Sequence, residues 1–581
     1  MNHSNTLRRS AQSLAVASAI ALLGAMGTAH AQPAAPVGDS AMVRLIRGLM
    51  QSGTLTKDVG EALLAQAQTE AMAAQQAQRQ ASAPAAAAGG LRVEPGDVRV
   101  PYISQTVRDQ IRDEVKGQVM AQAKTEGWAA PNETPEWSKR IRVEGDMRVR
   151  NESRSYSGGN SNIEINWASI NDGSGYDVNT NTNGQSVPLL NTRQDRRNLF
   201  RARARLGIFA DITDQTKAGV RLASGSDESP VSTTQTLGGG LGKKNVWLDQ
   251  MWLSHQPLDW LTVTGGRFGN PFVSTDMLYS GDLNFDGIAA QFDKTLANKD
   301  ISLFGTLGLI PLEYSSDNFP SRDDKKQASE NKWLLGAQFG ANWKLDRDNS
   351  LRGAIAYYDF HNTTGQVSEP CALYAGAEAC STDWSRPAFM QKGNTLMLLR
   401  NIALNPTDPA NTPQPQYVGL ASKFQLIDLN FRWDTRVAGY GLRLDANYIR
   451  NMAYDETKMF ERARGGIVNN YGAVVDGVEG PFRSGGNAYS LQATFGKPSP
   501  TARGDWNVLA GYKRIEPDAL PDGFNDSSFH QGGTNAKGYF LGGSYAIDKN
   551  AWFTGRWSAT KQVFGPPLAI DTLQLEFNAR F

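Results

Sequence analysis

The end of the chain alternates strictly between apolar and polar side chains. The apolar positions are Leu573, Leu575, Phe577, Ala579 and the terminal Phe581, and the residues between them are Thr572, Gln574, Glu576, Asn578 and Arg580. A period of two is the pattern of a β-strand, whose successive side chains point to opposite faces. A strand with one apolar face, one polar face and an aromatic end is typical of the closing strand of a membrane-spanning β-barrel.

The same period runs through most of the chain from Trp137 onward. We identify sixteen candidate strands, with boundaries soft by a few residues. They lie near 140–152, 198–210, 215–224, 245–256, 260–268, 284–293, 300–310, 332–345, 350–361, 422–434, 439–451, 487–497, 505–516, 536–547, 551–562 and 569–581.

The connections between these strands alternate in length. Links after even-numbered strands are short, whereas those after odd-numbered strands are mostly long: 153–197, 225–244, 269–283, 311–331, 362–421, 452–486 and 517–535, with 563–568 as the short exception. Tight turns at one end and long loops at the other are typical of outer-membrane barrels. A soluble β-sandwich gives no reason for this asymmetry. We therefore predict an all-β, antiparallel transmembrane barrel of about sixteen strands over 137–581.

Tryptophans concentrate near the predicted strand ends. Amphipathic aromatic rings prefer the headgroup depth of a membrane, so we expect them to form girdles around the barrel. They are Trp137, Trp247, Trp252, Trp260, Trp333, Trp343, Trp433, Trp506, Trp552 and Trp557.

The N-terminus has the features of an export signal over residues 1–31. Arg8 and Arg9 precede an apolar stretch from Leu14 to Leu23, which is too short to span a bilayer, and Ala29-His30-Ala31 offers a small-residue cleavage site. A membrane anchor is the alternative interpretation. Export followed by a barrel predicts the bacterial outer membrane as the location.

Residues 32–136 have a different pattern, with Ala/Pro/Gly-rich linkers at 32–38 and 81–90. Apolar residues recur at helical spacing within 39–80, and again within 104–126 at Val107, Ile111, Val115 and Val119. We expect a short α-helical region in the periplasm, because an even number of strands leaves both chain ends on one side. The helical region either packs on the barrel or on a neighbouring protein, or it serves self-association; the sequence leaves both roles open.

Composition excludes several classes of function. Without Arg8 and Arg9, the chain has 57 basic and 58 acidic residues, and this balance argues against a nucleic-acid partner. The cysteines, Cys371 and Cys380, either pair as a loop disulfide or remain free thiols, and no surrounding residues make them a metal site. The histidines of the exported chain, His255, His361 and His530, are scattered. We therefore expect neither an enzyme nor a cofactor.

The predicted inward face of the first strands is strongly basic. It carries Arg142, Arg148, Arg150, Arg201, Arg203 and Arg205, with Arg221 on the next strand. Guanidinium groups at every second position lie about 7 Å apart and repel one another unless anions balance them. One interpretation is a lumen wall that favours anions; the other is an ordinary salt-bridged barrel wall.

The third long link, 269–283, contains Asp276 and Asp282. In many trimeric porins the third external loop folds inward and narrows the channel, and this link has the same position. It is therefore a candidate constriction loop, with an ordinary surface loop as the alternative.

Four stretches resemble the bacterial putative-porin family of outer-membrane barrels with periplasmic helical segments. They are the run from Val100 to Lys116 with its Gly127-Trp128 end, the run from Arg142 to Arg148, the run from Gly266 to Phe272, and the terminal Phe581. The resemblance implies a passive channel and, by analogy with other sixteen-stranded porins, a homotrimer. It implies no particular solute.

We therefore expect a porin that passes small hydrophilic solutes or ions through a water-filled lumen, with outer-membrane lipid and lipopolysaccharide around it. A specific channel for anionic solutes is one alternative. An adhesin or structural barrel, with partners held by the long loops, is another.

Overall fold

The computed structural model describes residues 65, 112–119, 121–122, 136–226, 229–315, 329–377, 379–474 and 476–581. The chain divides into two units, Met1–Gln122 and Ala123–Phe581. Within the first, residues 112–119 and 121–122 are helical, while the predicted export signal and most of the predicted helical region lie outside the described residues. Among the described residues, helices of sufficient length and apolarity to cross a membrane are absent.

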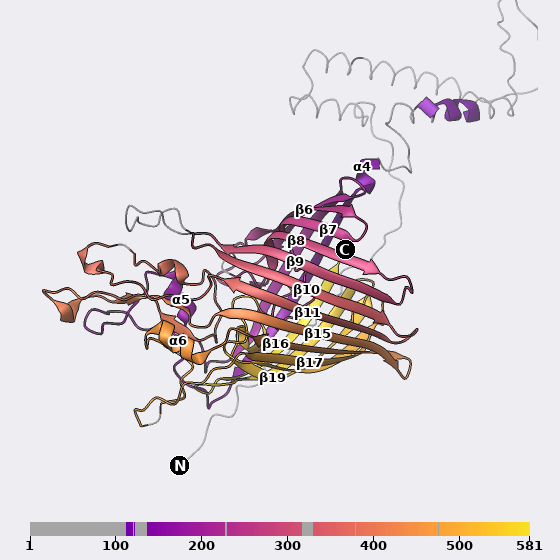
Figure 1. The fold of residues 1–581 in the computed structure, drawn as a ribbon. Helices are drawn as coiled ribbons and strands as arrows, with labels where there is room; N and C mark the ends of the chain where they lie inside the picture. The colour runs from indigo at the N-terminus through magenta and orange to yellow at the C-terminus, as the bar shows by residue number, and fades with distance from the viewer. Residues whose placement is uncertain are drawn as a thin grey trace, which may run out of the picture. The chain divides into compact units, whose positions relative to one another are not determined.

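The second unit is a closed barrel of sixteen antiparallel strands, which confirms the predicted fold (Figure 1). Each long strand pairs with its neighbours in chain order, and the last pairs with the first. The strands are β1 (Ile141–Tyr156), β3 (Arg196–Asp211), β4 (Thr216–Ser224), β6 (Val246–Leu258), β7 (Leu261–Gly269), β8 (Asn284–Thr295), β9 (Ile301–Glu313), β10 (Lys332–Lys344), β11 (Ser350–His361), β15 (Phe424–Val437), β16 (Tyr440–Asn451), β17 (Asn487–Gly496), β18 (Trp506–Ile515), β19 (Ala536–Asp548), β20 (Ala551–Gln562) and β21 (Ala569–Arg580).

Pairing of β1 with β21 closes the barrel. The register runs from Asp146 opposite Arg580 to Tyr156 opposite Ile570. The terminal Phe581 completes it, because its backbone N–H and C=O both bond to Gly145 at 3.0 Å. The wall therefore has no unpaired strand edge at this seam, as a lipid-facing sheet requires.

Side chains of the strands alternate between lipid and lumen. On β21, Leu575 is 53% exposed on the outer face, whereas Gln574 is 4% exposed on the inner face. On β3, Leu206 and Ile208 are exposed outward, and Arg203 and Arg205 lie inside. Apolar side chains therefore face outward and polar side chains face the lumen, as the alternation at the end of the chain predicts.

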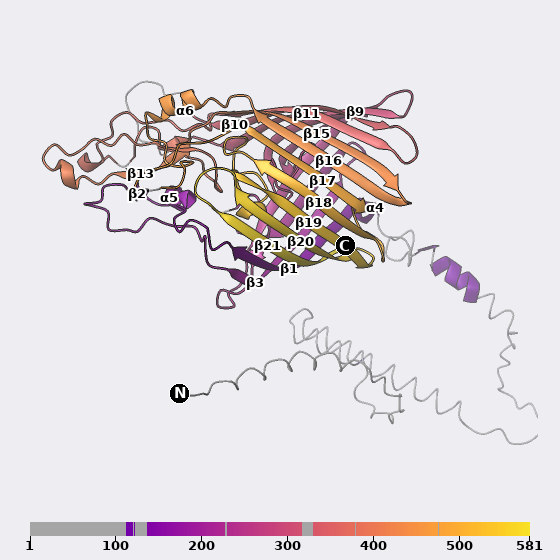
Figure 2. The ribbon, with the colours of Figure 1, turned by 90° about the horizontal axis from the view of Figure 1, so that it is seen from below.

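Short turns gather at one end of the barrel and long loops at the other (Figures 1 and 2). Four of the long loops are loop 2 (225–245), loop 3 (270–283), loop 5 (362–423) and loop 7 (516–535). Small elements fold within the loops: α5 (Trp167–Asp172), α6 (Glu456–Ala463), and the strand pairs β2 (Tyr176–Asp177) with β13 (Pro415–Gln416) and β12 (Leu396–Leu398) with β14 (Val418–Leu420). The alternation of hydrophobicity gave no signal for these.

Two features differ from expectation. The first strand continues to Tyr156, four residues beyond its predicted end, so residues 153–156 belong to the wall rather than to a loop. Three of the tryptophans expected in the girdles point into the barrel. Trp247 is one of them, because its neighbours Val246 and Leu248 are exposed outward. Trp252 packs against Phe209, with ring centroids 6.1 Å apart, and Trp552 lies under Arg580. Both have outward neighbours, Met251 and Phe553, so strand parity places these two rings inside.

Candidate constriction of the lumen

Loop 3 leaves the rim and enters the lumen. Phe272 begins this path by lying on the inner wall over Gly308 of β9 and Gly336 of β10, where a Cβ atom would stand 2.7 Å and 2.6 Å from the ring. Its ring also meets Tyr358 edge-on, with centroids 5.1 Å apart. Only glycine leaves the space for this close approach.

Hydrogen bonds hold the next residues of loop 3 to the wall. The backbone of Val273 bonds to the Gln338 side chain in both directions, at 2.7 and 2.8 Å. Thr275 donates to Asn447 of β16 at 2.5 Å. Beyond them, Met277 and Leu278 are fully buried in the apolar cluster that fills this side of the lumen.

The two predicted aspartates of loop 3 contact basic residues on different strands of the lumen wall. Asp276 lies 2.6 Å from the ammonium group of Lys513 on β18 and 3.9 Å from Arg556 on β20. Asp282 lies 3.1 Å from Arg203 and 3.4 Å from Arg205, both on β3. Loop 3 is therefore held to the basic part of the wall at two points.

Carboxylates interleave with the arginines of the wall. Asp146 of β1 bonds to Arg203 and Arg205, each at 2.7 Å. The strand register explains this contact, because Arg148 faces Arg203 and Asp146 faces Arg205 across β1 and β3. Asp146 therefore offsets part of the repulsion between arginines that face each other across the two strands, such as Arg148 and Arg203.

Glu152 is the most buried of these carboxylates, at 1% side-chain exposure. It contacts Arg154 at 2.6 Å, Arg201 at 3.3 Å and Arg150 at 3.4 Å. Glu576 of β21 supplies a further contact, 2.5 Å from Arg150. Glu152 is the last residue of the first predicted strand. Because it lies two residues beyond Arg150, the alternation of the strand could have placed it on the inner face beside the arginines.

A polar cavity of about 250 Å³ lies between loop 3 and the basic wall. Its charged lining consists of six arginines and three aspartates: Arg148, Arg150, Arg201, Arg203, Arg205, Arg556, Asp276, Asp282 and Asp526. Five of the seven arginines predicted from the sequence therefore meet at one place, together with both loop aspartates.

The other two predicted arginines lie elsewhere. Arg142 is half exposed near the short-turn end, beside Glu144 and Asp211. Arg221 bonds to Asp249 at 2.6 Å. Neither lines the cavity.

Cations still exceed anions when the surrounding groups are included. Lys513 and Arg154 join the six arginines, and Asp146, Glu152 and Glu576 join the three aspartates, which gives eight positive and six negative groups. Two guanidinium Nε atoms, those of Arg148 and Arg201, are buried without a hydrogen-bond partner in the described part of the chain. The positive excess of the lining attracts anions into the cavity.

The residues predicted from the sequence did not include Lys513, which pairs with Asp276, or Thr234 and Asp526, which line the cavity. Lys513 is on the inward face of β18, where strand alternation could have identified it, since Val508 is exposed on the outer face. Thr234 of loop 2, which accepts a hydrogen bond from Arg148, and Asp526 of loop 7 lie in irregular loops. Such segments carry no periodic signal that would place a side chain in the lumen.

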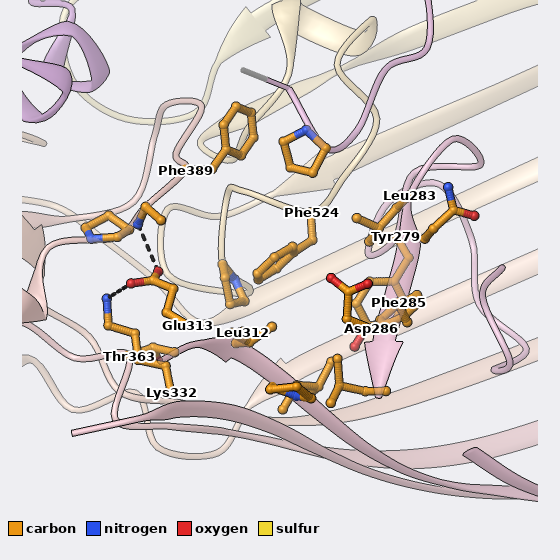
Figure 3. A pocket seen from close by; sticks show the side chains of 18 of the residues that line it. Tyr279, Leu283, Phe285, Asp286, Leu312, Glu313, Lys332, Thr363, Phe389 and Phe524 are labelled. Atoms are coloured by element: carbon orange, nitrogen blue, oxygen red, sulfur yellow. Dashed lines mark hydrogen bonds and ion pairs between the residues drawn. The ribbon is translucent and has the colours of Figure 1, made fainter. Parts of the chain in front are cut away.

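A second, mostly apolar pocket of about 180 Å³ opens near the long-loop end (Figure 3). Phe389 of loop 5 and Phe524 of loop 7 face Tyr279 and Phe285 across it. At its edge, Glu313 bonds to Lys332 at 2.5 Å and accepts the N–H of Ala388 at 2.9 Å. Loops 3, 5 and 7 therefore pack together above the constriction.

Cys371 and Cys380 are bonded to each other in loop 5, with their Cα atoms 5.6 Å apart. They lie far from the polar cavity in the sequence and do not line it. Within the described residues, clusters of His, Cys, Asp and Glu suited to holding a metal ion are absent.

A closed lipid-facing barrel with a polar, charged lumen defines the class of outer-membrane channels. The chain belongs to the family described as "Putative porin", whose model matches residues 39–581. It is accordingly a channel protein of the outer membrane. Among curated proteins, none matches the chain.

Solved structures of bacterial porins are similar to the chain at low identity. OprB of Pseudomonas putida has 12% identity and a TM-score of 0.38, over 76% of this chain and 95% of that one. The outer-membrane channel DcaP of Acinetobacter baumannii has 9% identity and a TM-score of 0.34, over 76% and 97%. OmpF of Salmonella typhi, in complex with daunomycin, has 8% identity and a TM-score of 0.35, over 76% and 97%. At these levels, the solutes of those proteins do not transfer to this chain.

Proposed function

We propose that this protein is a passive diffusion channel for small hydrophilic solutes, with a constriction that favours anions. The observation that carries the proposal is the cavity between loop 3 and the wall, where six arginines face three aspartates. A positive excess in a narrow, partly desolvated passage raises the local concentration of anions and lowers that of cations.

Ion selectivity in planar bilayers tests this proposal. We expect the triple variant Arg201→Gln, Arg203→Gln and Arg205→Gln to shift the reversal potential in a salt gradient toward cation preference. Arg142→Gln is the matched control, because that side chain is half exposed near the short-turn end and outside the cavity. An unchanged reversal potential in the triple variant, with the barrel still folded, would refute the anion preference.

A specific channel for anionic solutes is the second candidate. The six arginines that line the cavity favour it, since guanidinium groups bind carboxylate and phosphate groups strongly. Conductance separates the two functions: saturation at millimolar solute indicates a binding site, whereas linear dependence indicates simple diffusion. Liposome swelling separates both from an adhesin or structural barrel, because a plugged barrel admits no sugar.

The proposal includes three further elements that derive from the sequence. They are cleavage of the export signal after residue 31, a periplasmic location for the N-terminal helices, and a homotrimer. N-terminal sequencing of the mature protein, protease protection in intact cells and mass measurement in detergent test them in that order.

A further inference from the structure

The outer face of the barrel carries a row of tyrosines from β16 to β19. They are Tyr448, Tyr489, Tyr512 and Tyr539, one on each strand in turn, and the ring centroids of Tyr512 and Tyr539 are 4.8 Å apart. On the same face, Leu491, Val508 and Leu541 are exposed toward the short-turn end. Tyrosines next to an aliphatic surface mark the boundary between hydrocarbon and headgroups.

Three cations lie directly beyond the tyrosines, toward the long loops. Arg514 of β18 faces Lys537 of β19, and Lys537 faces Lys561 of β20, so they form one rung across three strands. Arg514 and Lys537 are each two residues from Tyr512 and Tyr539, which places them on the same outer face. A fourth cation, Arg450, stands two residues beyond Tyr448.

Carboxylates on this face do not balance the rung. Glu516 contacts Arg514 at 3.3 Å, and Asp571 of β21 is exposed one strand beyond Lys561. Among the described residues, Lys537 and Lys561 have no carboxylate within ion-pair distance. Like charges directly opposite one another on neighbouring strands are destabilising, so an external anion would stabilise this rung.

We propose that this face binds the phosphorylated glycolipid of the outer leaflet. A phosphate group contacts Arg514, Lys537 and Lys561, while the acyl chains lie along the tyrosines and the aliphatic residues below them. Leu491, Val508 and Leu541 extend the apolar surface from the tyrosines toward the short-turn end, which favours a lipid over a soluble anion. The next strands, β21 and β1, present Asp571 and Ser155 at this end of the outer face, so the basic rung is confined to one sector.

Binding of lipid A to the full-length chain, refolded in detergent without lipopolysaccharide, tests the proposal. The probes are bisphosphorylated lipid A and its dephosphorylated form, with bound lipid counted by native mass spectrometry. We expect the wild-type protein to prefer the phosphorylated form, and the variant Arg514→Gln, Lys537→Gln, Lys561→Gln to lose roughly tenfold or more in affinity. The control variant Lys294→Gln, Lys344→Gln, Lys549→Gln removes the same charge at the short-turn end and should bind as wild type.

Four results would overturn the proposal. Two of them are an unchanged affinity for lipid A in the triple variant and equal binding of phosphorylated and dephosphorylated lipid A by the wild-type protein. The third is binding of inorganic phosphate with no lipid A bound. The fourth is a change in the oligomer mass of the triple variant without a change in its lipid binding. The last would make this face a contact between copies of the chain. Single-channel conductance of the Arg514→Gln, Lys537→Gln, Lys561→Gln variant should stay at the wild-type value, because these three side chains point away from the lumen, and this measurement confirms that the barrel is folded.

Discussion

Asp282 Oδ1 and Arg203 Nη1 lie 3.1 Å apart, although 79 residues separate them in the chain. The contact joins loop 3 to the basic wall, and a second hydrogen bond, from the backbone N–H of Thr233 to Asp282 Oδ2, ties it to loop 2. One carboxylate thus both anchors the loop and reduces the positive charge of the cavity.

Replacing Asp282 with asparagine should increase the preference for anions. A unit charge about 4 Å from an ion in water is worth about 1 kcal/mol, so its loss should change the local anion concentration roughly fivefold. Reversal potentials in a salt gradient measure this shift. Asp211→Asn is the control, because that carboxylate pairs with Arg142 outside the cavity. A shift of equal size in both variants, or a shift toward cations, would contradict the assignment.

Glu152→Gln should destabilise the barrel strongly. The carboxylate is almost fully buried and contacts three arginines, so its loss leaves their charges buried and uncompensated at a cost of roughly 3 kcal/mol. Urea unfolding in lipid vesicles, followed by tryptophan fluorescence, measures the change. Glu144→Gln serves as the comparison, because its contact with Arg142 is half exposed and should contribute less than about 1 kcal/mol. Similar losses in both variants would show that burial of Glu152 is not the cause.

The packing of loop 7 should depend on pH through Asp522. Burial raises the pKa of Asp522 to about 7, and its Oδ2 atom has no hydrogen-bond partner within the described residues. The folded-state pKa exceeds the ordinary value of 3.8, so the folded loop favours the protonated acid. Stability should therefore be greatest below pH 4, fall between pH 4 and 7, and level off above.

Hydrogen exchange of residues 516–535, corrected for intrinsic rates, measures this dependence. The isosteric Asp522→Asn variant should remove the slope, whereas Asp408→Asn, at an exposed position of loop 5, should leave it unchanged. Persistence of the full slope in Asp522→Asn would assign it to another buried acid of loop 7, such as Asp518, whose pKa burial also raises above its ordinary value.

The barrel was predictable from the sequence because alternation is a local property. Residues such as Leu575 and Gln574 differ in polarity for the same reason that they differ in exposure: one faces outward and the other faces the lumen. Parity also placed Arg148, Arg201 and Arg203 on the inner face without any knowledge of their partners. Strand ends were less certain, because Ser153 to Tyr156 continue β1 without a clear apolar alternation.

The contacts of the constriction were not predictable in the same way. Asp276 and Asp282 were candidates by loop order alone, and their partners Lys513 and Arg203 come from strands far apart in the chain. The inward path of loop 3 depends on Phe272 fitting over two glycines of β9 and β10. Such a fit is a tertiary property that no spacing within the loop encodes.

The bond between Cys371 and Cys380 should protect one segment of loop 5 without affecting the barrel. It closes a loop with a sequence separation of 9, for which chain entropy predicts a stabilisation of roughly 2.5 kcal/mol. The closed segment contains Tyr374, which is 42% exposed and therefore a site for chymotrypsin. Beyond Cys380, the buried pair of Asp383 and Arg400, 2.7 Å apart, anchors the loop independently.

We therefore expect the Cys371→Ser, Cys380→Ser variant to be cleaved faster after Tyr374, because the segment opens more often once the constraint is lost. Limited proteolysis with chymotrypsin, analysed by mass spectrometry, gives the rates at individual sites. Cleavage after Tyr314, which is 69% exposed and lies outside loop 5, is the internal control and should not change. The heat-modifiable gel shift should also stay at the wild-type temperature. Equal acceleration at Tyr374 and Tyr314 would instead indicate a general loosening of the loops, and would contradict a local role for the disulfide.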